Sequence, residues 1–319
     1  MQKLNKRLVK LLILSAALFV FSIFFSNKGR NAPKSTESVL FNPKYLNETD
    51  SVIITVKKES GDEVLTIKKE GDFWLLKKQD EKGNELCTFA DIKLVSSFFE
   101  RLCEFRKLYK VSDKEKDFSA LATDENNALS ISFTNRSGKD FPSLYFGHQN
   151  QITGRIFLRS GESKTTYESQ NNLSQFLTTD LNYWAEGEIL SGINNPLTIT
   201  LSQGESSKAI DEKTEGFEAK KRSLLSLRHG KIISEKALEE ILDKGKMFAD
   251  SFFKAQDGSG RIAVLTFFKA EEGGESIYYT RKVTPSPAES SENTFALYSE
   301  NCAYEISEWT YYKIISIFN

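Results

Sequence analysis

An apolar run without a single charged residue, at positions 11–25, constrains this chain more than any other feature. Extended back to Leu8 it covers about 18 residues, close to the ~20 that a helix needs to span a bilayer. Basic residues precede the run and place the N-terminal tip in the cytoplasm under the positive-inside rule. The sequence therefore predicts a single-pass protein of the bacterial inner membrane, anchored through residues 8–25, with its body in the periplasm or otherwise outside the cytoplasm.

A cleaved signal peptide is the alternative interpretation of the same segment. Cleavage needs small residues at the −3 and −1 positions after the apolar run. Here the run ends in the bulky residues 23–25, and Ser26, Asn27 and Lys28 follow. This pattern favours an uncleaved signal anchor, and the intact mass of the mature protein distinguishes the two cases.

The formal net charge of −1 hides an asymmetry between this tip and the body of the chain. Residues 1–30 carry six Lys and Arg and no Asp or Glu, which leaves 37 basic and 44 acidic residues in 31–319. An acidic body without a dense Lys/Arg face is a poor electrostatic match for nucleic acid. Nucleic acid is therefore not an expected partner.

Cysteine and histidine are scarce, with three and two residues respectively. Cys87 and Cys103 flank a predicted helix that would separate them by about 24 Å, whereas a disulfide needs Cα atoms within about 7 Å. Cys302 is distant in sequence, so free thiols are expected. No metal-ligand spacing, Walker motif or dinucleotide motif is present, and neither a metal nor another cofactor is expected.

Short β-branched and aromatic runs separated by turns dominate the start of the body. The runs at 52–56, 64–67 and 73–76 predict three strands of an antiparallel meander. Thr88 and Asp91 then resemble a capping box, and apolar residues recur at helical spacing over 89–108. This segment predicts a helix packed on the sheet.

The same order of elements recurs in the second half of the body. Residues 128–133 correspond to 261–268, and 165–168 correspond to 302–305. The predicted fold class is α+β: an N-terminal transmembrane helix followed by two similar units of antiparallel sheet with packed helices, through a probable internal duplication. The predicted divisions are the tip and signal anchor at 1–27, a stalk at 28–49, a first unit at 50–185, a connector at 186–196 and a second unit at 197–319.

The order of these features resembles the bacterial DUF4340 family. The residues that carry the resemblance are the turn and strand at 71–76, the helix start at 88–91, the strand pair at 147–158 and the second unit opening at 195–199. Members are described as auxiliary proteins of gliding-motility-type ABC transporters. The resemblance implies an assembly role beside transporter subunits, and it implies no catalytic residues.

Two histidines and one basic string are the candidate chemical groups of the body. His148 follows a strand at a turn, and neither a GxSxG motif nor a Cys–His signature supplies it with a nucleophile. The basic string is the more distinctive, and it could contact an anion, a phospholipid headgroup or an acidic partner. Its residues are Lys220, Lys221, Arg222, Arg228, His229 and Lys231. The alternative is a segment whose leucines pack inward while its charges are solvated.

The leading functional hypothesis is a non-enzymatic, membrane-anchored auxiliary subunit of an ABC-type transport system, in which ABC transporter subunits are the expected protein partners. One alternative is a module that binds an envelope lipid or polysaccharide in a cleft between the two units. A hydrolase with a site scattered along the sequence is the third.

Overall fold

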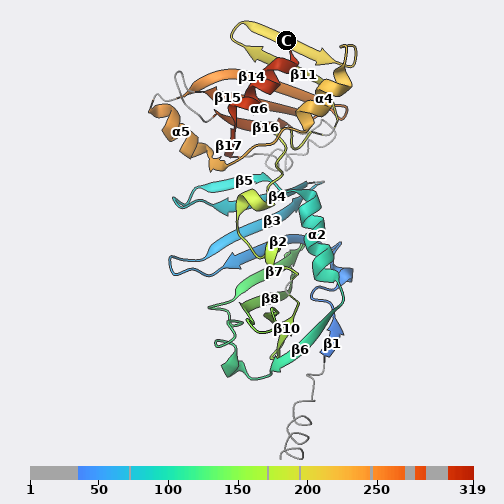
Figure 1. The fold of residues 1–319 in the computed structure, drawn as a ribbon, viewed down its shortest axis with the longest axis vertical. Helices are drawn as coiled ribbons and strands as arrows, with labels where there is room; N and C mark the ends of the chain where they lie inside the picture. The colour runs from blue at the N-terminus through green and yellow to red at the C-terminus, as the bar shows by residue number, and fades with distance from the viewer. Residues whose placement is uncertain are drawn as a thin grey trace, which may run out of the picture.

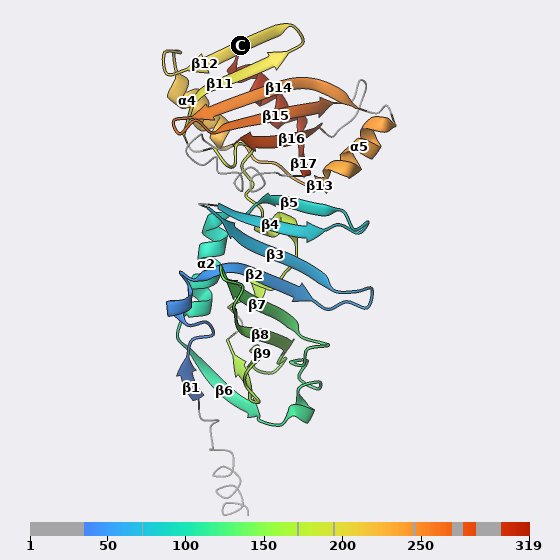
Figure 2. The same ribbon diagram turned by 180° about the vertical axis from the view of Figure 1, so that it is seen from behind.

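Two antiparallel β-sheets, one after the other along the chain, form the body of this protein (Figure 1). The structure is a computed structural model and describes residues 35–71, 73–170, 172–193, 195–244, 247–269, 277–284 and 301–319. Figure 2 shows from behind that the two sheets are stacked end to end along the long axis of the molecule.

The first sheet contains ten strands. They are β1 (Ser35–Ser38), β2 (Thr49–Val56), β3 (Glu63–Glu70), β4 (Phe73–Gln79), β5 (Glu85–Phe89), β6 (Arg106–Ser112), β7 (Leu129–Asn135), β8 (Asp140–Gln149), β9 (Ile156–Ser160) and β10 (Thr166–Ser169). Their order across the sheet is β1-β6-β10-β9-β8-β7-β2-β3-β4-β5, and every neighbouring pair is antiparallel. The predicted meander is present as β2, β3 and β4, because alternating apolar residues and glycine-containing turns favour tight hairpins.

The second sheet contains seven strands. They are β11 (Pro196–Gln203), β12 (Ser206–Asp211), β13 (Ile232–Ser234), β14 (Phe248–Asp257), β15 (Ile262–Lys269), β16 (Ile277–Thr284) and β17 (Cys302–Ile306). Their order is β12-β11-β14-β15-β16-β17-β13, again with antiparallel neighbours throughout.

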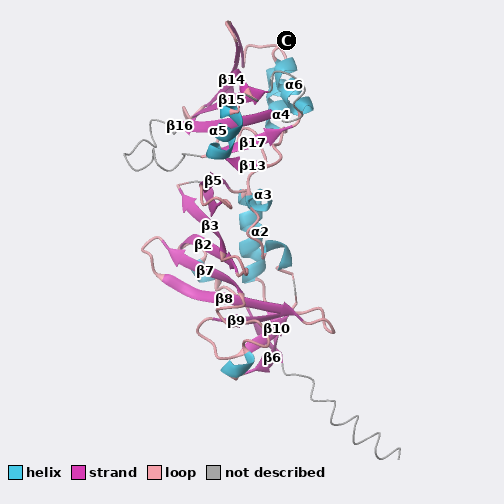
Figure 3. Ribbon diagram, turned by 90° about the vertical axis from the view of Figure 1, so that its left-hand side faces the viewer, coloured by secondary structure: helices cyan, strands magenta, loops and turns pink. Residues whose placement is uncertain are grey.

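Short helices cover one side of the sheets. They are α2 (Ile92–Cys103), α3 (Leu181–Trp184), α4 (Phe217–Leu225), α5 (Glu235–Asp243) and α6 (Glu308–Ile317), with 3-10 turns η1 (Pro43–Tyr45), η2 (Glu115–Asp117) and η3 (Ser174–Phe176). Helices α2, α3, α4 and α6 lie on the same side of the two sheets (Figure 3). The apolar stripe of α2 is buried, and its Phe98 packs edge-to-face on Trp184, which is fully buried. Aromatic packing of this kind accounts for much of the core.

Both sheets contain the same order of seven strands. Matched by position along the chain, β3-β2-β7-β8-β9-β10-β6 of the first sheet corresponds to β12-β11-β14-β15-β16-β17-β13 of the second. In this correspondence 128–133 matches β14 rather than 261–268, and the helix matching α2 is α4. Residues 248–257 form a strand because β11 and β15 pair with both of its edges.

The predicted fold class is wrong in its balance of elements, because the described chain is mostly antiparallel β-sheet and the helices are few and short. The helix is shorter at both ends than the predicted 89–108. Phe89 and the predicted cap Thr88 belong to β5, and Phe105 and Leu108 lie beyond the C-terminal end of α2. The side chain of Asp91 caps α2 by accepting from the backbone N–H groups of Lys93 and Leu94. Local apolar spacing was compatible with one long helix, but the strand ladders on either side end it early.

The predicted signal anchor at 1–27 and residues 28–34 of the predicted stalk lie outside the described residues. The rest of that stalk is part of the folded body, because β1 pairs with β6, η1 follows it and Phe41 is buried in the core. Within the described ranges, no helix combines the length and the apolar composition needed to cross a membrane. The transmembrane element of the predicted fold and the single-pass inner-membrane location are therefore corrected: no element of the described fold supports them.

Candidate functional site

A wide groove of the described surface lies between the tips of two hairpins. The β2–β3 hairpin and the β4–β5 hairpin project on the same side of the first sheet (Figures 1 and 2). The groove encloses about 1120 Å³ and is bordered by Asp62 at one tip and Glu81 at the other. Gly61 and Gly83 take positive φ angles of 123° and 79° in the two turns, a region of backbone space that glycine enters without steric cost.

Charged and polar side chains of both signs line this groove. Its cations are Lys58, Lys77 and Lys78, and its carboxylates are Asp62, Glu63, Asp80, Glu81, Glu85 and Asp180. Val64, Leu86, Leu181 and Ile232 supply the apolar lining, and no aromatic ring contributes. Ligand pockets for small apolar molecules are lined mainly by hydrophobic and aromatic groups, so this groove suits a polar ligand.

Glu63 and Lys78 of the groove lining share a hydrogen-bond network with the buried Thr179, and this network is called the floor of the groove below. The Glu63 carboxylate accepts from the Thr179 hydroxyl at 2.6 Å and lies 3.8 Å from the Lys78 ammonium, which donates to the Thr179 carbonyl at 2.8 Å. A hydrogen bond from Lys58 is the largest cause that lowers the pKa of Glu63, and the Thr179 hydroxyl adds to it. The Glu63 carboxyl is thus held in its ionised form.

The second unit supports the rim of the groove at the β4–β5 turn. Ser234, which caps α5, donates its hydroxyl to Asp80 at 2.9 Å, and Lys82 donates to both carboxylate oxygens of Glu240 at 2.9 and 2.7 Å. Burial opposes ionisation of Asp80, but hydrogen bonds from Asn84, Ser234 and the Lys82 N–H outweigh it and lower the pKa of that carboxyl. Only Ile232 of the second sheet lines the groove itself, so the groove belongs almost wholly to the first unit.

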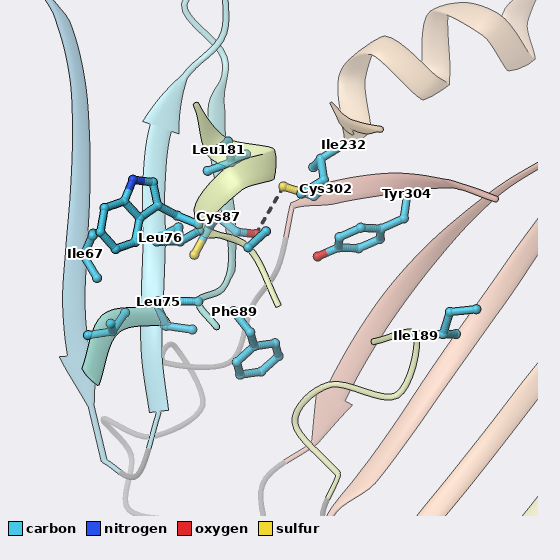
Figure 4. Packing of buried hydrophobic residues seen from close by; sticks show 14 of the residues in the cluster. Ile67, Leu75, Leu76, Cys87, Phe89, Leu181, Ile189, Ile232, Cys302 and Tyr304 are labelled. Carbon is cyan, nitrogen blue, oxygen red and sulfur yellow. Dashed lines mark hydrogen bonds between the residues drawn. The ribbon is translucent and has the colours of Figure 1, made fainter. Parts of the chain in front are cut away.

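The two units meet beside the groove in a packed joint. Figure 4 shows strand β5 facing β17, with the Cys302 thiol donating to the Cys87 carbonyl at 3.2 Å. Thr88 and Tyr304 share a hydrogen bond of 2.7 Å between their hydroxyls. The three cysteines are free thiols. Buried apolar residues from both units continue across this joint.

Side-chain amides cap the two strand edges that meet at the joint. Asn301 accepts from the Cys87 N–H at 2.6 Å, and Asn182 accepts from the Ile232 N–H at 3.1 Å. Buried backbone donors need partners, and here side chains provide them without joining the two sheets into one.

The structure disperses the predicted basic string. Lys221 is buried and donates to Glu218 at 2.6 Å and Asn195 at 2.9 Å, so it serves packing of α4. The His229 ring lies 4.7 Å from the Tyr304 ring and donates from Nε2 to the Glu186 carbonyl at 2.9 Å, within the joint. Lys220 is partly exposed, and Arg222, Arg228 and Lys231 are exposed. An anion or partner contact at this string stays a prediction.

His148 is exposed at the end of β8. Within the described ranges, no group of three or more His, Cys, Asp and Glu side chains is placed to hold a metal ion. The shifts of the groove carboxylates Glu63 and Asp80 keep them ionised at neutral pH, whereas a general acid needs a raised pKa.

One carboxyl at the joint does have a raised pKa and predicts a pH effect. Burial raises the pKa of Glu186, and the nearby Asp91 carboxylate raises it further. Because its pKa is higher in the folded protein, this carboxyl binds more protons in the folded state than in the unfolded state. Its contribution to the free energy of unfolding therefore falls as the pH rises above 4.5, the ordinary pKa of a glutamate carboxyl. We expect Glu186→Gln to stabilise the protein at pH 7 and to have little effect at about pH 4. Urea titrations of both proteins at the two pH values measure this, and an equal effect at both would contradict it.

Sequence reasoning missed the groove. Its charges appear in the sequence as mixed runs such as 80–82, which are typical of solvated turns. No local signal connects them with Thr179 or Asp180, about a hundred residues further along the chain.

No protein-family model, no curated protein and no solved structure matches this chain. The resemblance to the DUF4340 family therefore stays a prediction that rests on the residues quoted for it.

Proposed function

We propose that this protein is a non-enzymatic binding protein that holds an extended, basic segment of a partner polypeptide in the hairpin groove. The observation that carries the proposal is the groove itself, about 1120 Å³ in volume and lined by three lysines and six carboxylates. An excess of carboxylates attracts cationic groups, so it favours basic partners over acidic ones and raises the rate at which a basic partner associates.

An extended polypeptide matches this lining better than a lipid or a small apolar ligand does. Its backbone N–H and C=O groups and its basic side chains suit the donors and acceptors along the two hairpins. The paired floor of Glu63 and Lys78 presents both signs of charge at one place. Four separated apolar residues are too few to bury an acyl chain, whose binding depends on continuous apolar contact.

The resemblance to the DUF4340 family supplies a candidate source of that segment, namely a subunit of an ABC transporter. In this proposal the protein assists assembly by holding a partner chain. Co-purification of transporter subunits with the wild-type chain, and their loss with the groove variant described below, is the expected result in cells.

Binding of short fluorescent peptides tests the groove directly. We expect a peptide of alternating lysine and threonine to bind more tightly than one of alternating glutamate and threonine, as measured by fluorescence anisotropy. The double variant Glu81→Lys with Glu85→Lys reverses two charges of the lining and should weaken the lysine peptide by about tenfold, or ~1.4 kcal/mol.

Glu100→Lys with Glu162→Lys is the matched control, because both glutamates are exposed and lie outside the groove lining. It makes the same change of net charge and should leave binding unchanged. Equal weakening by both double variants would mean that only the overall charge matters, and equal affinity for both peptides would reject a basic ligand.

A further inference from the structure

Both sheets share an order of seven strands, and among the described residues the outer edge of β12 is the end of that order that no other strand or unit covers. In the first sheet, β4 pairs with β3 at one end of the seven strands, and β1 pairs with β6 at the other. In the second sheet, the edge of β13 faces the first unit, where Asn182 accepts from the Ile232 N–H. No strand among the described residues pairs with the outer edge of β12, which occupies the position of β3.

The hairpin that precedes β12 determines which of its backbone groups face outward. Gly204 has φ +57° in the two-residue turn between Gln203 and Ser206, which lie opposite each other. In such a hairpin the flanking pair exchanges hydrogen bonds, so that alternate residues point toward and away from the neighbouring strand. Ser207, Ala209 and Asp211 therefore direct their N–H groups to the open edge. At Asp211 this edge is occupied, because its N–H donates to the Thr214 hydroxyl at 3.0 Å and its carbonyl accepts from the Thr214 N–H at 2.9 Å. The free part of the edge is therefore 206–209.

Between Ser206 and Ala209 the edge has neither a proline nor a bulge. Residues 206–209 are exposed, and they include no proline and a single charge. That charge, Lys208, lies opposite the buried Leu201 and donates to the Asn319 side chain at 2.9 Å. Natural edge strands are commonly blocked by lysine, proline or a bulge. Here the lysine is tied to the end of the chain that follows α6, so it does not screen the edge.

We propose that β12 pairs with β12 of a second copy of this chain, antiparallel and about a two-fold axis. Every neighbouring pair in both sheets is antiparallel, and a two-fold contact between identical strands is antiparallel by symmetry. Centring the pair on Ala209 places two methyl groups opposite each other and sets Lys208 opposite Ile210 of the second copy. The two lysines are thereby kept apart, and the sheet continues across two molecules. This inference does not depend on the function proposed for the groove.

Site-directed crosslinking of the full chain tests this pairing. In a Cys103→Ser background, which leaves the native cysteines Cys87 and Cys302 buried, Ala209→Cys should join two chains through a short bis-maleimide. Thr200→Cys is the control: it lies opposite Ala209 on the neighbouring strand and so one strand further from the axis. Crosslinked dimer with the first variant and not with the second supports the pairing. No dimer, or equal dimer with both variants, would overturn it.

The molar mass in solution provides a second readout. Ala209→Pro removes an outward-facing N–H while leaving the ladder to β11 intact, a position where proline is tolerated. We expect light scattering to show a mass falling from that of two chains to that of one, 36.2 kDa. Ala209→Val keeps the N–H and should keep the dimer. A wild-type protein with the mass of one chain, or an Ala209→Pro protein that keeps the mass of two chains, would contradict the proposal. If the proline variant does not fold, the crosslinking result decides.

Discussion

Replacing Arg281 by methionine is expected to lower the free energy of unfolding by about 2–5 kcal/mol. The Arg281 guanidinium is almost completely buried, with 1% of its surface exposed. It donates to the carbonyls of Glu188 and Ile189 at 3.0 and 3.1 Å and to the Tyr304 hydroxyl at 3.3 Å. Methionine fills most of the volume but donates no hydrogen bond, so the buried Ile189 carbonyl loses this donor and bears a desolvation cost, whereas the Glu188 carbonyl still accepts from Ser191.

Arg281 also contacts both units, which explains why one residue has so large an effect. Its guanidinium lies 5.4 Å from the ring of Phe89 in the first unit and 4.9 Å from that of Tyr304 in the second. Urea denaturation followed by circular dichroism measures the loss. Lys282→Met is the control, because Lys282 is exposed on the next position of β16 and should change stability by no more than about 0.5 kcal/mol. A loss below about 1 kcal/mol for Arg281→Met would show that packing rather than hydrogen bonding dominates the joint.

Gly147→Ala is expected to destabilise the first unit by about 3 kcal/mol or more. A Cβ atom at Gly147 would lie 2.0 Å from the carbonyl oxygen of Leu121 and 2.9 Å from a methyl group of Thr123. The Leu121 carbonyl is backbone and also accepts from the His148 N–H at 3.3 Å, so it cannot move away without breaking that contact. Segment 115–128, which covers this part of the sheet, must then separate from β8.

Gly161→Ala separates this clash from the general effect of adding a methyl group. Its Cβ would meet the ring of Tyr145 at 3.4 Å, an ordinary van der Waals contact. We expect it to cost less than about 1 kcal/mol. Thermal unfolding of the two variants measures the difference, and similar melting temperatures would mean that segment 115–128 adapts to the added atom.

Part of this fold could be predicted from the sequence and part could not. The strands β2, β3 and β4 lie where alternating apolar residues and turns predicted them. The helix after them is present, but the capping residue is Asp91 rather than Thr88. The sequence is compatible with either residue as the cap, but Thr88 belongs to β5, where it pairs with Leu76 of β4. The predicted membrane anchor and inner-membrane location receive no support from the described fold.

The candidate site could not be predicted, because its residues are ordinary in sequence. Glu63 and Lys78 lie on different strands of the first sheet, and Thr179 reaches them from a segment more than a hundred positions away. Their meeting depends on the register between β3 and β4 and on where the chain returns after β10. No periodicity or motif contains that information.

The sequence by itself determined the features that act over a few residues: the hairpin turns at 61 and 71 and the strand runs on either side of them. Only the tertiary structure decided that 248–257 is a strand, that the charges at the hairpin tips form one groove and that the edge of β12 is open. The physical reason is the range of the interactions. Turn and capping preferences depend on nearby backbone groups, whereas sheet pairing joins distant segments and overrides weak local propensity.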